Sequence, residues 1–181
     1  YGSEEQIFVK RATSNDIGNY NLVKIKWDSA QELFYYEGSN NLNYTNHPMV
    51  FVSWCGAYAF ARHYNLELPS ELEWENAATI TGWNNSVLDN SNFNFLNSGD
   101  DWDNGTTPIN YYDYNISFDL KDMLGNVCEW TSNISNETRI CKGSSFKNII
   151  LNDINSYPHR NIDNGMNSVN QDVGFRIIKR Y

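Results

Sequence analysis

Three cysteines are the side chains of this sequence best suited to nucleophilic or soft-metal chemistry. Cys55, Cys128 and Cys141 are its complete set among 181 residues, and no two of them have the Cys-x-x-Cys spacing of a zinc or redox site. Three cysteines allow at most one disulfide, and we interpret Cys128 and Cys141 as buried free thiols. The cysteines by themselves therefore predict no reactive centre.

The three histidines, His47, His63 and His159, have no mutual spacing typical of a metal triad. No Ser-His-Asp arrangement and no pair of catalytic carboxylates stands out in the rest of the sequence. Residue types and spacing therefore do not indicate a hydrolytic or metal-dependent active site.

Local patterns predict the elements that position these side chains. Apolar residues recur at helical spacing between 55 and 64, with Ser53 as the N-cap. Ser70 and Glu73 form a capping box that predicts a second helix. A β-prone run covers residues 47–54, and alternating apolar positions predict a last strand from Val173.

Composition bounds the class of protein. The formal net charge is −9 and 15% of the residues are aromatic, which is typical of a folded domain that repels nucleic acid. The longest apolar runs are far shorter than the ~18 residues of a membrane span. We expect one domain over 1–181, with 1–46 as its poorly defined N-terminal part, and neither nucleic acid nor a membrane span as a partner.

Four blocks carry a family resemblance. In order they read HPMVFVSWCGAYAFA, LPSELEWENAA, DMLGNVCEW, and KGSSF followed by VGFRI. They resemble the formylglycine-generating-enzyme, or sulfatase-modifying-factor, family. The resemblance covers residues 47–176 and implies an α+β, C-type-lectin-like fold with two helices around mixed antiparallel sheets and long loops. It also implies that Trp54, Trp74, Trp130 and Phe175 anchor the core.

The resemblance implies an activity that this sequence does not support. Enzymes of the family oxidise a substrate cysteine with copper held by paired cysteines just after a GGS-like motif, and soft thiolates are what Cu(I) requires. Here Phe146-Lys147-Asn148-Ile149 follows Ser144-Ser145, and no cysteine occurs beyond Cys141. We therefore interpret the chain as a non-enzyme.

A structural calcium ion is a second implication of the family. The family's equivalent of the DMLGNVCEW block binds calcium through an acid or amide, two backbone carbonyls and a glutamate. Asp122, Gly125, Val127 and Glu129 match those positions, and oxygen donors on a turn suit a hard cation. The alternative is that Asp122 and Glu129 cap turns or form ion pairs without a metal.

Residues 148–172 differ in composition from the rest of the chain. Seven of these 25 residues are Asn, against 21 of the other 156, and 18 of the 25 are Asn or a residue reached by one change at an adenine of its codon. This resembles the variable proteins of diversity-generating retroelements, whose variable region lies between GGSW-like and GFR-like motifs. An AT-rich genome is the alternative explanation.

The segment 147–172 lacks an apolar period, so we expect it to be mostly exposed and to bind a ligand. The main interpretation is a non-catalytic variable protein that binds a protein or cell-surface ligand, located on a virion or cell surface. The alternative is an undiversified family module or a degenerate enzyme. The residues assigned to the ligand are Asn148, Ile149, Asn152, Asp153, Tyr157, His159, Asn161, Ile162, Asp163, Asn167, Ser168 and Asn170.

Overall fold

The computed structural model describes residues 25–28, 30, 33–36, 46–80, 93–102, 105–112, 120–135, 138–148, 159–162 and 166–181. Its helices are α1 (Trp54–His63) and α2 (Glu71–Ile80). Its strands are β1 (Ile25–Asp28), β2 (Leu33–Tyr36), β3 (Cys128–Ser135), β4 (Thr138–Lys142), β5 (His159–Ile162) and β6 (Val173–Phe175). Neither helix is long and apolar enough to cross a membrane.

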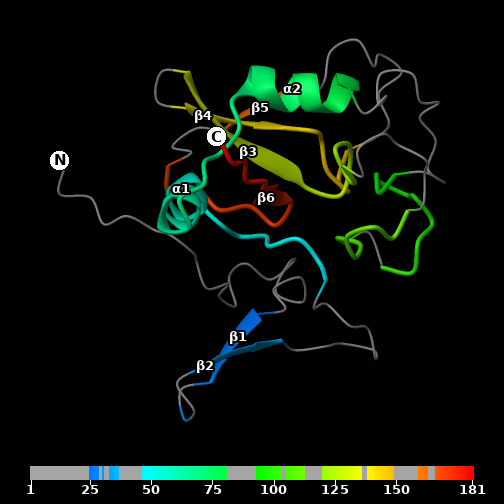
Figure 1. Ribbon diagram of the computed structural model, residues 1–181. Coiled ribbons are helices and arrows are strands. Elements are labelled where there is room, and N and C mark those ends of the chain that lie inside the picture. Colours follow the sequence, from blue (N-terminus) through cyan, green and yellow to red (C-terminus); the bar gives the residue numbers. More distant parts are fainter. Residues whose placement is uncertain are drawn as a thin grey trace.

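A four-stranded sheet in the order β5-β4-β3-β6 organises the molecule. β3 pairs antiparallel with β4 and parallel with β6, and β5 adds to the other edge of β4. Figure 1 shows α2 above this sheet and α1 below it, with the β1–β2 hairpin further down. The sheet is therefore mixed, and the α+β fold class inferred from the sequence is confirmed.

Alternation along β3 gives the two sides of the sheet different cores. Trp130, which is fully buried, packs in the cluster that contains Trp54 of α1. Trp74 of α2 belongs to a second cluster, with Phe93 and Phe95. The expectation that tryptophans anchor the core is confirmed.

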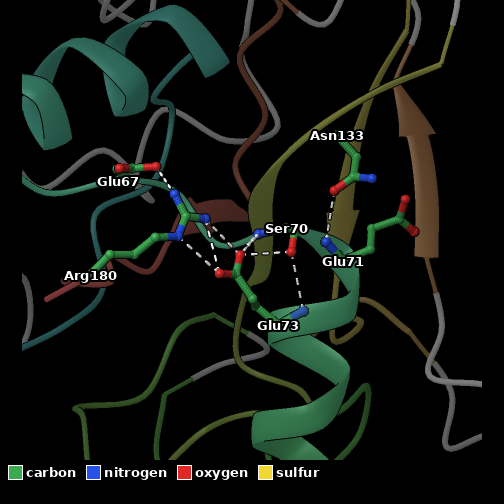
Figure 2. A network of polar contacts seen from close by, with 6 residues as sticks. All are labelled: Glu67, Ser70, Glu71, Glu73, Asn133 and Arg180. Atoms are coloured by element: carbon green, nitrogen blue, oxygen red, sulfur yellow. Dashed lines mark hydrogen bonds and ion pairs between the residues drawn. The ribbon is translucent and has the colours of Figure 1, made fainter.

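Both helices begin where the sequence predicts. The Ser53 side chain accepts a 3.1 Å hydrogen bond from the amide of Gly56. At α2 the Ser70 amide donates to Glu73 Oε2 at 2.8 Å, and the Glu73 amide donates to Ser70 Oγ at 3.2 Å. Figure 2 shows this capping box together with Arg180, which forms ion pairs with Glu73 and with Glu67.

Two expectations about local structure are wrong. The run 47–54 contains only the single bridge residue Val52, because Phe51 adopts φ 57°, which interrupts an extended strand. Cys128 and Cys141 are not free thiols but form a disulfide between β3 and β4, with their Cα atoms 5.5 Å apart. Cys55, buried in α1, is the one free cysteine.

Candidate ligand-binding site

A tight turn after β4 places the residues that open the candidate segment. Gly143 adopts φ +99°, and a Cβ there would lie 2.7 Å from the Met123 carbonyl oxygen and 3.0 Å from the Trp74 ring. Glycine is therefore required at this position by both conformation and space. The turn leads to Ser145, which is fully buried, and then to Lys147, which is exposed.

Ser145 belongs to a buried polar network that joins the two ends of the segment. Its hydroxyl lies 2.8 Å from Asp172 Oδ2 and 2.8 Å from Asn148 Oδ1. Arg160 of β5 donates from Nη1 to the same Asp172 oxygen at 2.9 Å. The network therefore connects the turn after β4, the edge strand β5 and the residue before β6.

The carboxylate of Asp172 is almost completely buried, with 2% of the residue exposed. Burial alone would raise the pKa of this carboxyl, but the hydrogen bond and charge of Arg160 and the hydrogen bond from Ser145 outweigh it and hold the pKa below its usual value. Asp172 is therefore charged at neutral pH and fixes Arg160 in place.

Lys147 adds a second cation to the network. Burial lowers the pKa of the Lys147 ammonium, the charge of Asp172 opposes this, and the charge of Arg160 lowers it further. Both cations act on the charge of Asp172, but among the described residues Arg160 alone forms an ion pair with it. Together Lys147, Arg160 and Asp172 sum to a charge of +1, in a protein of net charge −9.

Backbone hydrogen bonds attach this segment to the rigid frame. The Asn148 carbonyl accepts from the Leu96 amide at 2.9 Å, and the Asn170 carbonyl accepts from the Phe51 amide at 3.0 Å. The Met166 carbonyl accepts from the amide of Cys55 in α1 at 3.1 Å. The described ends of the segment are therefore part of the scaffold.

The exposure expected for 147–172 is found only at its start. Lys147 and Asn148 are exposed, whereas the described side chains from 160 to 170 are half-buried and those of Gln171 and Asp172 are buried. Ile162 packs against the core of α1 and β3. The expectation of a mostly exposed surface is wrong for this described part, because β5 is a strand of the central sheet.

The residues assigned to the ligand are distributed as follows. Asn148 lies at the exposed turn, and three others lie half-buried between β5 and β6: Asn167, Ser168 and Asn170. His159, Asn161 and Ile162 lie on β5. Ile162 is half-buried, and of His159 and Asn161 only the backbone is described. Five lie outside the described residues: Ile149, Asn152, Asp153, Tyr157 and Asp163.

The sequence analysis did not identify Arg160 or the buried role of Asp172. Asp172 carries no local signal of burial, and Arg160 is one cation in a segment rich in Asn. The GSS motif predicts a turn at Ser145, but its hydroxyl bonds Asp172, 27 residues further along the chain, and Asp172 in turn is bonded by Arg160 of β5. Only the pairing of β5 with β4 brings them together.

The four positions matched to calcium lie on one turn and the start of β3. Gly125 has φ +76°, and a Cβ at this position would lie only 2.5 Å from the Asn94 carbonyl oxygen, so glycine is required here. Val127 is buried. Burial raises the pKa of the Asp122 carboxyl to about 6, and the charge of Glu129 contributes to this increase. A cation would stabilise the charged form of Asp122.

Both carboxylate oxygens of Glu129 already accept hydrogen bonds from protein side chains. Its Oε2 accepts from Trp74 Nε1 at 2.7 Å and from Arg176 Nε at 2.9 Å, and its Oε1 accepts from Arg176 Nη2 at 2.8 Å. Oε1 keeps one lone pair for another partner. Calcium at this turn would therefore be held by Asp122, the carbonyls of Gly125 and Val127, and that one remaining position on Glu129.

A second buried network orders the long connection before this turn. Asn94 Nδ2 donates to the Gly105 carbonyl at 2.8 Å, and Asn126 Oδ1 accepts from the Thr107 amide at 3.1 Å. The described residues 93–102 and 105–112 contain no helix or strand. Side-chain amides thus fix this loop where regular secondary structure does not.

The fold and these motifs define the class of protein, a formylglycine-generating-enzyme-type α+β domain. The family model of the sulfatase-modifying factor enzyme 1-like domain matches residues 4–181. The chain belongs to this family.

Three comparisons describe its relatives. The chain is 31% identical to the mouse formylglycine-generating enzyme over 109 residues, covering 52% of this chain and 29% of the relative. It is 28% identical over 150 residues to the inactive C-alpha-formylglycine-generating enzyme 2 of Bos taurus, covering 71% and 49%. The structure of PvdO from Pseudomonas aeruginosa is similar in fold, with a TM-score of 0.61 at 17% identity over 91% of this chain and 74% of that one.

This chain spans about half or less of the length of the curated relatives it matches. Those relatives include active enzymes and proteins named inactive, so membership of the family does not decide activity. The state of the three cysteines, the side chains that could bind copper, is more informative about activity. Cys128 and Cys141 are bonded to each other and Cys55 is buried by itself in α1, so no pair of thiolates is present to hold Cu(I).

Proposed function

We propose that this chain is a non-catalytic ligand-binding domain of the sulfatase-modifying-factor family. The observation that carries the proposal is the bonding state of its three cysteines. The Cys128–Cys141 disulfide and the buried Cys55 thiol leave no two thiolates for a copper ion. After the GSS motif, where the resemblance places the copper cysteines, the chain has Phe146, Lys147 and Asn148 instead.

We propose further that the domain is the variable protein of a diversity-generating retroelement. The Asn-rich composition of 148–172 supports this, as does its position between the GSSF and GFR motifs. Backbone hydrogen bonds that fix Asn148 and Asn170 to the frame are what a scaffold needs if the residues between them are to vary. An undiversified binding module or a degenerate enzyme is the alternative, which the presence of inactive relatives makes reasonable.

We place the domain in an oxidising compartment, on a virion or cell surface, with a protein or cell-surface ligand. The Cys128–Cys141 disulfide supports this, because such bonds persist in extracellular proteins and are rare in the cytosol.

A turnover assay tests the non-catalytic proposal. The purified protein, supplied with copper and a sulfatase-type cysteine peptide, should yield no formylglycine, while the mouse relative serves as the positive control. Copper-dependent product from this chain would refute the proposal.

The gene's neighbourhood tests the retroelement proposal. An adjacent reverse transcriptase and a template repeat that differs from this gene only at adenines are expected. A neighbourhood without both would leave the undiversified module as the better interpretation.

Substitution within the segment tests the binding role. Replacing Tyr157, His159, Asn161 and Asp163 together should change ligand selection. If these side chains contact the ligand and not the core, each change should shift the free energy of unfolding by only about ±0.5 kcal/mol, as surface changes usually do. Trp130→Ala is the contrasting core variant and should cost about 3–5 kcal/mol. A quadruple variant that unfolds as easily as Trp130→Ala would assign these residues to the scaffold.

A further inference from the structure

One edge of the Arg160 guanidinium is covered by the protein but has no hydrogen-bond partner. Its Nη1 donates to Asp172, but Nε and Nη2 are both buried and have no hydrogen-bond partner. The side chain as a whole is 39% exposed, so this edge lies close beneath the surface. A buried donor without an acceptor is destabilising, and an acceptor bound at this edge would remove that cost.

The same protein shows what fits such an edge. Arg176 uses its own Nε and Nη2 to bind the two oxygens of the Glu129 carboxylate at 2.9 and 2.8 Å. This is a two-bond arrangement in which planar guanidinium and planar carboxylate match. Arg160 offers the identical pair of nitrogens, and its third nitrogen is fixed by Asp172.

The charges around Arg160 favour an anion of low charge. Arg160 forms an ion pair with Asp172, and with Lys147 at the neighbouring turn the three groups sum to a charge of +1. The protein as a whole carries −9, so long-range repulsion disfavours a multiply charged ligand. A single carboxylate satisfies both conditions better than a phosphate dianion.

We propose that the Nε and Nη2 groups of Arg160, assisted by Lys147, bind a carboxylate of the ligand at the turn after β4. This rests on the proposed function, because it takes the segment 147–172 as the ligand-binding one. It goes beyond that function by naming the group recognised and the residue that recognises it.

A titration followed by NMR tests the proposal directly. The probe is N-acetylglutamate α-amide, with N-acetylglutamine α-amide as the neutral control and inorganic phosphate as a second arm. The Arg160 Nε–H signal should shift on addition of the glutamate probe and not of the glutamine probe. An Arg160 Nε–H signal that does not shift with the glutamate probe, or tighter binding of phosphate than of the carboxylate, would overturn the proposal.

Variants distinguish the contribution of the guanidinium's two-nitrogen edge to binding from that of its positive charge. Arg160→Lys keeps the positive charge and removes the two-nitrogen edge, so the dissociation constant for the glutamate probe should rise at least about tenfold. Lys147→Gln should raise it about threefold. Lys179→Gln, an exposed lysine of the last residues, removes the same charge elsewhere and should leave binding unchanged.

An equal loss of binding in Lys179→Gln and Lys147→Gln would reduce the effect to net charge and refute the site. Should Arg160→Lys fail to fold because Asp172 loses its partner, the Arg160 signal of the unmodified protein and the Lys147 pair still decide the question. Failure here is distinct from failure of the proposed function. A silent Arg160 signal in a catalytically inert protein refutes only the carboxylate site, whereas copper-dependent turnover refutes the function.

Discussion

Reduction of the Cys128–Cys141 disulfide should destabilise the domain by a calculable amount. The bridge spans a sequence separation of 13, and the chain-entropy relation gives a stabilisation of about 3 kcal/mol for a loop of that length. Domains of this kind are stable by about 5–15 kcal/mol, so the loss is a large fraction. With an m value near 2–3 kcal/mol/M, the urea midpoint should fall by about 1–1.5 M.

Tryptophan fluorescence during urea unfolding, with and without a phosphine reductant, measures this change. Cys55→Ala should show the same fall on reduction, because Cys55 is not in the bridge. The double variant Cys128→Ala, Cys141→Ala should show none. A midpoint in the unmodified protein that reduction leaves unchanged would refute the stabilising role.

Thiol counting with an aromatic disulfide reagent checks the same assignment. The native protein should show no reactive thiol, because Cys55 is buried and burial raises the pKa of its thiol. The protein unfolded without reductant should show one, and the protein unfolded with reductant three. Three thiols without reduction would restore the possibility of a copper pair.

Three further predictions follow from the charged groups. Arg176→Gln leaves Glu129 buried and unpaired and should cost about 3–5 kcal/mol in urea unfolding, with partial recovery in Arg176→Gln, Glu129→Gln. Chelation should lower the melting temperature and calcium restore it, and Asp122→Ala, which removes the side-chain oxygen ligand, should abolish that response; a temperature unaffected by chelator would exclude calcium. The native pKa of Asp172 lies below the ordinary 3.8, so its contribution to stability is complete above that value and disappears as the pH falls through and below it. Urea midpoints measured between neutral and acid pH should therefore decline less steeply in Asp172→Asn.

Local signals were sufficient for the helices. The Ser53 cap and the Ser70–Glu73 capping box depend on residues three positions apart, so the sequence alone contains the whole interaction. The turn at Gly125 and Asn126 is of the same kind, and both residues have positive φ. The last strand could also be predicted, although its parallel partner could not.

Interactions that depend on strand pairing could not be predicted. The disulfide joins β3 and β4, whose register is set by the whole sheet and not by a separation of 13 residues. Arg160 meets Asp172 because β5 pairs with β4 in one particular register. The exposure expected for the segment was wrong for its described part for a related reason: β5 joins the sheet by backbone pairing, which requires no apolar period, and its described side chains Arg160 and Ile162 are half-buried.

Residues from three of the family motifs are hydrogen-bonded to one another at the Glu129 carboxylate. This explains why these motifs indicate the scaffold and not the function. Trp74 belongs to the LPSELEWE block, Glu129 to GNVCEW and Arg176 to GFR, and both oxygens of Glu129 are bonded by the other two residues. The network ties α2, β3 and the end of β6 together whatever lies between Gly143 and Val173. The frame can therefore persist while the interval after the GSS motif changes. In this chain that interval contains no cysteine, so its function is argued from the residues of the interval and not from the family motifs.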